Sequence, residues 1–173
     1  PKEIIHFDQN IGLRNHILAC GDLALRHDAI IVLEDDLYVS PLFYKYTLHA
    51  ADFYKEEKSV AGISLYSHRF NETAKLRFTP LTDGHSVFFL QIASSWGQCW
   101  TKDQWTSFRI WYNCASNLKI SFTDLLPPDV LLWPESSWKK YFIKYIIEKN
   151  LFLVYPRVSY STNFGDRGAH HIG

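Results

Sequence analysis

An unbroken apolar run, Ala29 to Leu33, ends abruptly in three adjacent carboxylates, Glu34, Asp35 and Asp36, here called the acidic triplet. Five consecutive apolar residues, rich in β-branched side chains, are typical of a strand that is buried on both faces of a parallel sheet. The pattern therefore places the acidic triplet at the carboxyl end of a buried strand. In open α/β sheets, that is where ligands bind.

The residues on either side of this strand have the periodicity of further elements. Residues 3–7 have the pattern of a short strand, and apolar residues recur at helical spacing over residues 11–27. Strand, helix and central strand would then form a parallel crossover unit. After the triplet, Ser40 can act as N-cap and Pro41 as first residue of a helix that runs to about residue 57.

The rest of the chain continues to alternate strands with helices. Strand patterns occur at residues 60–64, 86–92 and 151–155, and helices are expected after an N-cap at Thr101 and from about Ser137 to Asn150. Two polar, proline-containing stretches separate some of these elements. Residues 65–85 are predicted to form a long loop or an irregular hairpin, and residues 114–134 are expected to be irregular. The expected fold is α/β: one domain, residues 1–173, with a GT-A-like or Rossmann-like, mainly parallel sheet flanked by helices.

Composition narrows the possible partners. Apolar residues make up 47% of the chain, while Lys and Arg number 18 and so do Asp and Glu, so the net charge favours neither nucleic acid nor a membrane surface. No apolar run approaches the roughly 18 residues of a transmembrane helix. The three cysteines lack the spacing of a zinc site and are expected to be buried thiols, at Cys20, Cys99 and Cys114.

Three neighbouring carboxylates repel one another, so the acidic triplet calls for a cation. A hard divalent ion, Mn²⁺ or Mg²⁺, is the simplest candidate, and Mg²⁺ typically takes one or two protein carboxylates with phosphate oxygens and water. Such an ion could neutralise a diphosphate leaving group. The alternative interpretation is an acidic turn that is solvated or caps the following helix.

Several motifs in order resemble those of a known enzyme class. Val32-Leu-Glu-Asp-Asp-Leu37 followed by Ser40-Pro41-x-Phe43 is similar to the metal-binding signature of GT-A-fold glycosyltransferases. The likeness is closest to the N-acetylglucosaminyltransferases of the N-glycan and O-mannose pathways and their bacterial relatives. It extends over Asn10-x-Gly12-Leu13, Ser95-Trp96-Gly97, Trp133 to Trp138, and Phe164-Gly165-x-x-Gly168-x-x-His171.

This resemblance implies roles for individual residues. Asp36 would be the metal ligand, and Glu34 and Asp35 would contact the ribose and sugar of a nucleotide-sugar donor. Independently of the resemblance, aromatic faces stack on sugar rings, which makes Trp96 the candidate for acceptor binding. Core packing is at least as likely for Trp96 alone, as it is for Trp100 and Trp133. The glycine-rich loop near the end of the chain would fold over the diphosphate, with Asn163, Gly165, Arg167, Gly168 and His171 as its donor-binding residues.

The chain departs from the family pattern in two places. In inverting members, an aspartate just before the tryptophan that opens the penultimate helix acts as the general base. This chain has Ser137 at that position, before Trp138. Glu135 is our first candidate for the general base and Asp129 the second, unless Glu135 merely occupies the first turn of the helix. The chain also starts after the family's first strand, helix and strand, so we expect it to lack that nucleotide-binding part.

The resemblance implies a metal-dependent inverting glycosyltransferase that moves a sugar from a nucleotide-sugar donor to a glycan or polysaccharide hydroxyl. Two rivals stay open, namely a non-catalytic carbohydrate-binding or scaffold domain and a nucleotidyltransferase. The lack of a cysteine framework favours a cytoplasmic location, at the inner face of the membrane, over the Golgi lumen.

Overall fold

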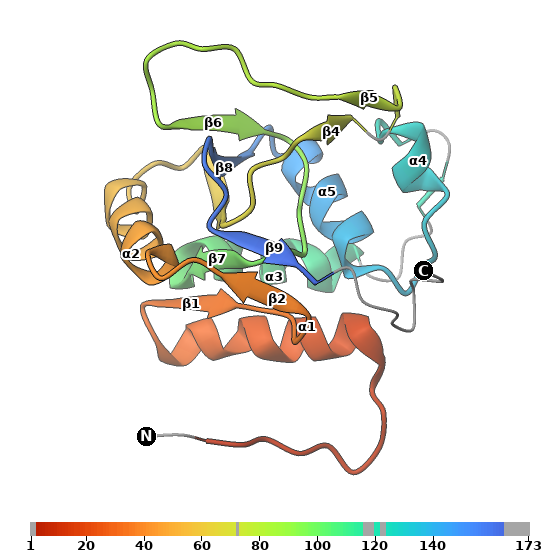
Figure 1. Cartoon of the computed structure of the whole chain (residues 1–173). Helices are drawn as coiled ribbons and strands as arrows, with labels where there is room; N and C mark the ends of the chain where they lie inside the picture. The colour runs from red at the N-terminus through yellow and green to blue at the C-terminus, as the bar shows by residue number, and fades with distance from the viewer. Residues whose placement is uncertain (1–2, 72, 116–119, 122–123, 165–173) are drawn as a thin grey trace.

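The computed structural model describes residues 3–71, 73–115, 120–121 and 124–164. At its centre lies a five-stranded sheet with the strand order β1-β7-β3-β8-β6 (Figure 1). These strands are β1 (Ala29–Val32), β3 (Val60–Ser64), β6 (Val87–Leu90), β7 (Gln98–Thr101) and β8 (Phe152–Pro156).

The sheet is mixed, so the expectation of a mainly parallel sheet is wrong. Among the described strands only β3 and β8 pair in parallel, whereas β7 pairs antiparallel with both β1 and β3, and β6 pairs antiparallel with β8. Parallel neighbours need a crossover connection, usually a helix. The described parts of residues 65–86 and 91–97 contain no helix, so the chain returns through β6 and β7 in the opposite direction to β3.

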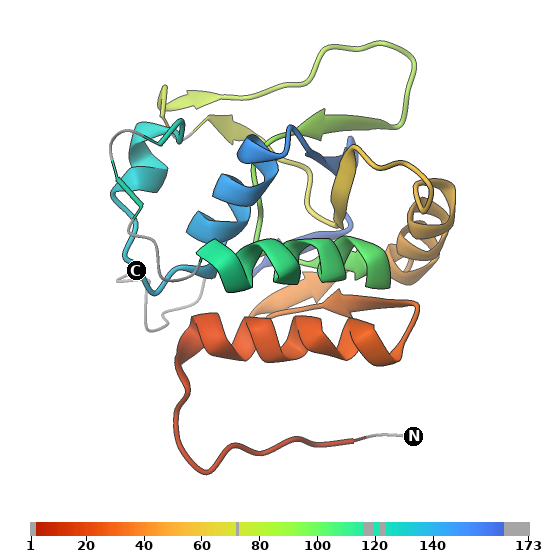
Figure 2. The same ribbon diagram turned by 180° about the vertical axis from the view of Figure 1, so that it is seen from behind.

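Helices cover both faces of this sheet. Alternate residues of a strand point to opposite faces, so Ile30 and Val32 of β1 join the larger hydrophobic core while Ala29 and Ile31 join the smaller one. On the smaller core lies α2 (Phe43–Phe53). The larger core is built with the helices seen from behind in Figure 2, namely α1 (Gly12–Asp22), the 3-10 helix η1 (Leu23–Arg26), α3 (Lys102–Ala115) and α5 (Trp138–Glu148).

Smaller elements lie around the sheet. Two short ribbons form, one from β2 (Leu37–Val39) with β9 (Ser161–Asn163) and one from β4 (Phe70–Asn71) with β5 (Leu76–Arg77). The second ribbon confirms the irregular hairpin expected in residues 65–85. A single helical turn, α4 (Pro128–Leu131), interrupts the segment expected to be irregular before α5. No helix in the described part of the chain is long and apolar enough to span a membrane.

The strand expected at residues 3–7 is absent, and with it the parallel crossover unit. These residues have no regular structure, and Ile4, Ile5 and Phe7 are 67%, 54% and 44% exposed. A strand is stabilised by cross-strand neighbours, and no described strand pairs with this segment. Its alternating pattern therefore does not suffice to form a strand.

The predicted helix starts are confirmed at Thr101 and shifted at Ser40. Thr101 and Gln104 form a reciprocal capping box, in which each side-chain oxygen accepts the other residue's backbone N–H, at 3.3 and 3.0 Å. At the start of α2, the Ser40 hydroxyl instead accepts the N–H of Leu42 at 3.2 Å within a turn. The helix consequently begins at Phe43 and ends at Phe53, inside the range expected.

The cysteines differ in exposure. Cys99 is 1% exposed in the central strand β7, where its neighbours in register are Ile31 and Ile63. Burial raises the pKa of the Cys99 thiol to about 12. Cys20 is half-buried, and Cys114 lies exposed near the end of α3, so the expectation of a buried thiol is wrong for Cys114.

Aromatic rings in mutual contact fill the larger core. The rings of Trp100 and Trp105 lie 4.8 Å apart, and both side chains are fully buried. Trp105 Nε1–H donates to Asp22 Oδ1 at 2.8 Å, which fixes the indole where α1 ends. This leaves no room at Gly21 of α1, where an added Cβ would lie 2.0 Å from a carbon of the Trp105 ring.

We expect Gly21→Ala to destabilise the protein by about 3 kcal/mol. The new methyl group must displace a rigid, buried indole, and overpacking of this kind outweighs the roughly 1 kcal/mol that Ala gains over Gly in a helix. The urea midpoint of unfolding measures the loss. Cys114→Ala, an exposed helical position, is the control and should leave the midpoint nearly unchanged. An unaltered midpoint for Gly21→Ala would contradict this account of the core.

Candidate functional site

The acidic triplet lies in the turn between β1 and β2. Glu34 is half-buried, while Asp35 and Asp36 are exposed to solvent. The predicted position after a strand is confirmed, but the expected burial on both faces of a parallel sheet is wrong, because β1 is a half-buried edge strand that pairs antiparallel with β7. The chain then reverses into β2, so that the triplet occupies a tight turn between β1 and β2.

The end of the described chain lies beside this turn. In the antiparallel β2–β9 ladder, Leu37 is opposite Asn163. The next residue, Phe164, donates its backbone N–H to the Asp36 carbonyl at 3.0 Å, and its ring contacts that of Tyr38 at 3.7 Å. Of the predicted donor loop, Asn163 is therefore brought to the triplet. Its other members, Gly165, Arg167, Gly168 and His171, lie outside the described residues.

The triplet is electrostatically strained. The pKa of Glu34 is raised, mainly by burial and then by the negative charges of Asp36 and Asp35. The ammonium of Lys139, in the first turn of α5, opposes this and lowers the pKa. A perturbed carboxylate with a like-charged neighbour is typical of functional sites. A bound cation would relieve the repulsion.

The oxygen atoms at the triplet suit a hard divalent ion that is also coordinated by the phosphates of a bound donor. Asp36 offers carboxylate oxygens to solvent, and oxygen ligands suit Mg²⁺ or Mn²⁺. The residues that the structure describes contain no group of three or more His, Cys, Asp or Glu side chains that could hold a metal by themselves. An ion at Asp36 would therefore need phosphate oxygens and water to complete its shell.

The predicted tryptophan loop packs beside the triplet. Gly97 has φ of 84°, a left-handed conformation that favours glycine. A Cβ at this position would also lie 3.3 Å from a methyl carbon of Leu33, the residue before the triplet. Trp96 is held by two contacts, because its N–H donates to Ser94 Oγ at 3.2 Å and its carbonyl accepts the hydroxyl of Ser161 in β9.

Trp96 lines a cavity of about 300 Å³, together with Tyr66, Trp133 and Lys139. Tyr66 packs against the Trp96 ring at 4.5 Å, and Lys139 lies over the ring of Trp133 at 4.9 Å. Because Lys139 also acts on the charge of Glu34, it links this cavity, called the Trp96 cavity below, to the acidic turn. Trp100 is instead fully buried in the core.

Lys139 is the site residue that sequence reasoning missed. Its only signal was its place right after Trp138, at the start of a helix in the segment that resembles the family. A lysine there would ordinarily be taken for a solvated side chain, since most lysines are exposed.

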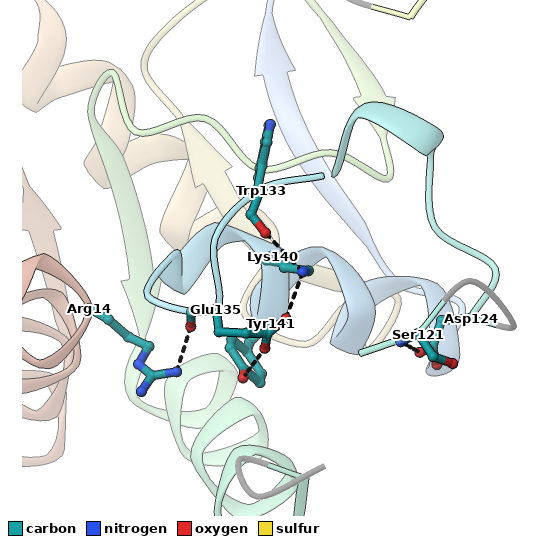
Figure 3. Close-up of polar contacts among 7 residues, drawn as sticks. All are labelled: Arg14, Ser121, Asp124, Trp133, Glu135, Lys140 and Tyr141. Atoms are coloured by element: carbon teal, nitrogen blue, oxygen red, sulfur yellow. Dashed lines mark hydrogen bonds and ion pairs between the residues drawn. The ribbon is translucent and has the colours of Figure 1, made fainter. Parts of the chain in front are cut away.

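Glu135 is held in a structural network (Figure 3). Its carboxylate accepts hydrogen bonds from Lys140 Nζ and the Tyr141 hydroxyl, both at 2.8 Å, and its carbonyl accepts one from Arg14 at 2.7 Å. The hydrogen bond from Lys140 is the main cause that lowers the pKa of Glu135. Glu135 lies in the turn before α5, whose N-cap residue is Ser137. These contacts brace the entry to the helix.

Asp129, the second candidate base, has fewer hydrogen-bond partners than Glu135 in the described part of the chain. It lies in α4, and its Oδ2 atom is buried without a hydrogen bond from the described residues, 4.0 Å from Lys75 Nζ. Asp129 lines a cavity of about 310 Å³ next to the Trp96 cavity, with His68 and Ile92 lining both. A carboxylate oxygen with unused acceptor capacity is thus present close to the Trp96 cavity.

No protein-family model matches the chain, and a comparison with curated proteins finds no significant match. The assignment of function therefore depends on the chemistry of the site itself.

The Glu135–Lys140 pair predicts pH-dependent stability. Because the folded-state pKa of Glu135 is lowered, its stabilisation is present at neutral pH and is lost as the pH falls below the ordinary glutamate value of about 4.3. Glu135→Gln should cost about 1 kcal/mol at pH 7, and its stability should converge with the wild type towards pH 3. Urea unfolding across this range measures the difference.

The control is Glu56→Gln, at an exposed position after α2, which should change stability little at any pH. A Glu135→Gln deficit of the same size at pH 7 and pH 3 would contradict the ion pair as its cause.

Proposed function

We propose that the chain is the catalytic part of a metal-dependent inverting glycosyltransferase, acting on a nucleotide-sugar donor and on a glycan or polysaccharide hydroxyl. The observation that carries the proposal is the contact between Phe164 and Asp36. Two motifs more than a hundred residues apart in the sequence, each resembling part of one donor site, meet at one backbone hydrogen bond.

The residues around this contact divide the work. Asp36 holds the metal, while Glu34 and Asp35 contact the ribose and the sugar of the donor. A bound Mn²⁺ or Mg²⁺ would neutralise charge on the departing diphosphate. The family resemblance assigns contacts with the donor to Asn163, and contacts with its phosphates to Gly165, Arg167, Gly168 and His171, which lie outside the described residues. Lys139 adds positive charge at the border of the Trp96 cavity.

The acceptor occupies the Trp96 cavity. A sugar ring packs against aromatic faces, and Trp96, Tyr66 and Trp133 supply them. The acceptor hydroxyl then attacks the anomeric carbon of the donor sugar from the side opposite the diphosphate. The bond to the diphosphate breaks with its electron pair, and the hydroxyl proton passes to a carboxylate.

Contacts favour Asp129 over Glu135 as that carboxylate. A general base must be free to accept a proton and is most effective when its pKa lies near the working pH. Glu135 is bound by two donors that lower its pKa. Asp129 keeps an oxygen without a hydrogen bond in the described part of the chain, and it lines the neighbouring cavity.

The hydrogen bonds that occupy the Glu135 carboxylate also support the alternative of a non-catalytic carbohydrate-binding domain. If neither acid acts as base, the site would hold glycan without transferring sugar. In that case glycan binding would need neither nucleotide nor Mn²⁺.

Asp36→Asn should strongly weaken Mn²⁺-dependent donor binding. A thermal-shift series with UDP-, GDP- and CMP-sugars should raise the wild-type melting temperature with at least one donor when Mn²⁺ is added. Loss of a metal-ligand oxygen should weaken that binding about 100-fold. The control is Asp103→Asn, an exposed acid in the first turn of α3. Full retention of the shift in Asp36→Asn would remove Asp36 from the metal site.

Asp129→Asn and Glu135→Gln separate the two candidate bases. If Asp129 takes the proton, Asp129→Asn lowers kcat by about 10²- to 10⁴-fold while donor affinity stays unchanged. Glu135→Gln then loses stability but keeps its kcat. The reverse pattern would return the role to Glu135, and unchanged kcat in both variants would exclude both acids.

A further inference from the structure

A second hollow lies on the other face of the sheet, between α2, residues 85–87 and Tyr160. We call it the α2 groove. Its volume of about 560 Å³ is within the range of small-ligand sites. The side chains that matter below are Lys45, Tyr46, His49, Phe53, His85 and Tyr160. None of them belongs to the donor or acceptor site proposed above.

Fixed aromatic faces line this groove. Tyr46 and Tyr160 stack with their ring centres 4.4 Å apart and their planes 12° apart. The hydroxyl of Tyr46 donates to the Ser64 carbonyl at 3.2 Å, which fixes the pair against β3. Phe53, at the end of α2, is 79% exposed. Aromatic surfaces of this kind can pack against the C–H faces of sugar rings.

Lys45 supplies a positive charge to the groove, and His49 and His85 add imidazoles that can donate hydrogen bonds. None of its described lining residues is acidic. Of the acids that flank these residues in sequence, Asp52 pairs with Lys55 at 3.0 Å. Asp83 pairs with Arg157 at 2.6 Å and also accepts the backbone N–H of His85 at 3.0 Å. The groove therefore complements an anionic ligand.

A short segment joins this groove to the Trp96 cavity. Tyr160 lines the groove, and its backbone N–H donates to the Leu65 carbonyl at 2.8 Å. The next residue, Ser161, donates its hydroxyl to the carbonyl of Trp96. Two consecutive residues, Tyr160 and Ser161, thus connect the groove with the Trp96 cavity.

We propose that the α2 groove binds a carboxylate-bearing oligosaccharide, namely the stretch of an acidic polysaccharide acceptor that lies beyond the reacting sugar. Aromatic faces hold the sugar rings, and Lys45 with the two imidazoles holds the carboxylates. The role as acceptor anchor rests on the proposed glycosyltransferase function. The preference for an acidic glycan does not, because it follows from the groove alone.

Calorimetric titration of the full chain with tetragalacturonate and with maltotetraose tests the proposal, without nucleotide or metal. The wild type should bind the acidic tetrasaccharide at least about tenfold more tightly than the neutral one, because charged hydrogen bonds are added to the same stacking. Lys45→Glu should weaken binding of tetragalacturonate about tenfold. Phe53→Ala should weaken it as well through lost stacking.

The matched controls are Lys58→Glu and Leu81→Ala, exposed positions outside the groove. Both should bind like the wild type. Equal affinity for the two tetrasaccharides, no binding of tetragalacturonate, or an unchanged affinity in Lys45→Glu would each overturn the proposal. Because no donor or Mn²⁺ is present, such a failure is distinct from a failure of the glycosyltransferase assignment, which the Asp36→Asn series measures.

Discussion

The antiparallel pairing of β2 with β9 is the constraint on which the candidate site depends. It joins the turn that carries the acidic triplet to a segment more than a hundred residues later through three residue pairs. A two-stranded ribbon of this length is not stable alone. It is held by bonds at its edges, where Ser40 donates its N–H to the Tyr160 carbonyl at 2.8 Å and Ser161 donates to the Trp96 carbonyl. One ribbon thereby sets the positions of the triplet, the tryptophan loop and the tyrosine stack.

Two adjacent lysines of α5, Lys139 and Lys140, point into different environments. Successive residues on a helix point about 100° apart. Lys139 consequently faces the Trp96 cavity and the charge of Glu34. Lys140 is buried at 3% exposure and donates to the Trp133 carbonyl and the Glu135 carboxylate. A buried ammonium is tolerated only when it is paired. The carboxylate of Glu135 is therefore needed as the partner of Lys140, which gives Glu135 a structural role.

Several of the elements could be predicted because they depend on local pattern. The apolar run at Ala29, the capping box at Thr101 and the helix after Ser137 are encoded by neighbouring residues, and the structure has an element at each. Strand direction could not be predicted, since it depends on whether residues 65–86 return the chain through a helix. The segment at Ile4 failed for a similar reason, because a strand needs a partner that local sequence does not specify.

For the candidate site, sequence placed Asp36 and Trp96 in loops at strand ends, and the structure adds which distant segments meet there. The role of Lys139 and the engagement of Glu135 depend on three-dimensional contacts between segments, so spacing along the chain carried no signal for either. Asp129 was ranked second from sequence because it is farther from Trp138. Its unused oxygen became visible only with α4 in place.

The buried thiol of Cys99 has a practical consequence for following the fold in solution. It lies in the strand that pairs with both β1 and β3, whereas Cys114 lies exposed on α3. A thiol reagent reaches Cys99 only when these pairings open, and it reaches Cys114 in the native state. The rate at which a reagent modifies Cys99 therefore reports how often the sheet opens, and modification of Cys114 serves as the internal standard.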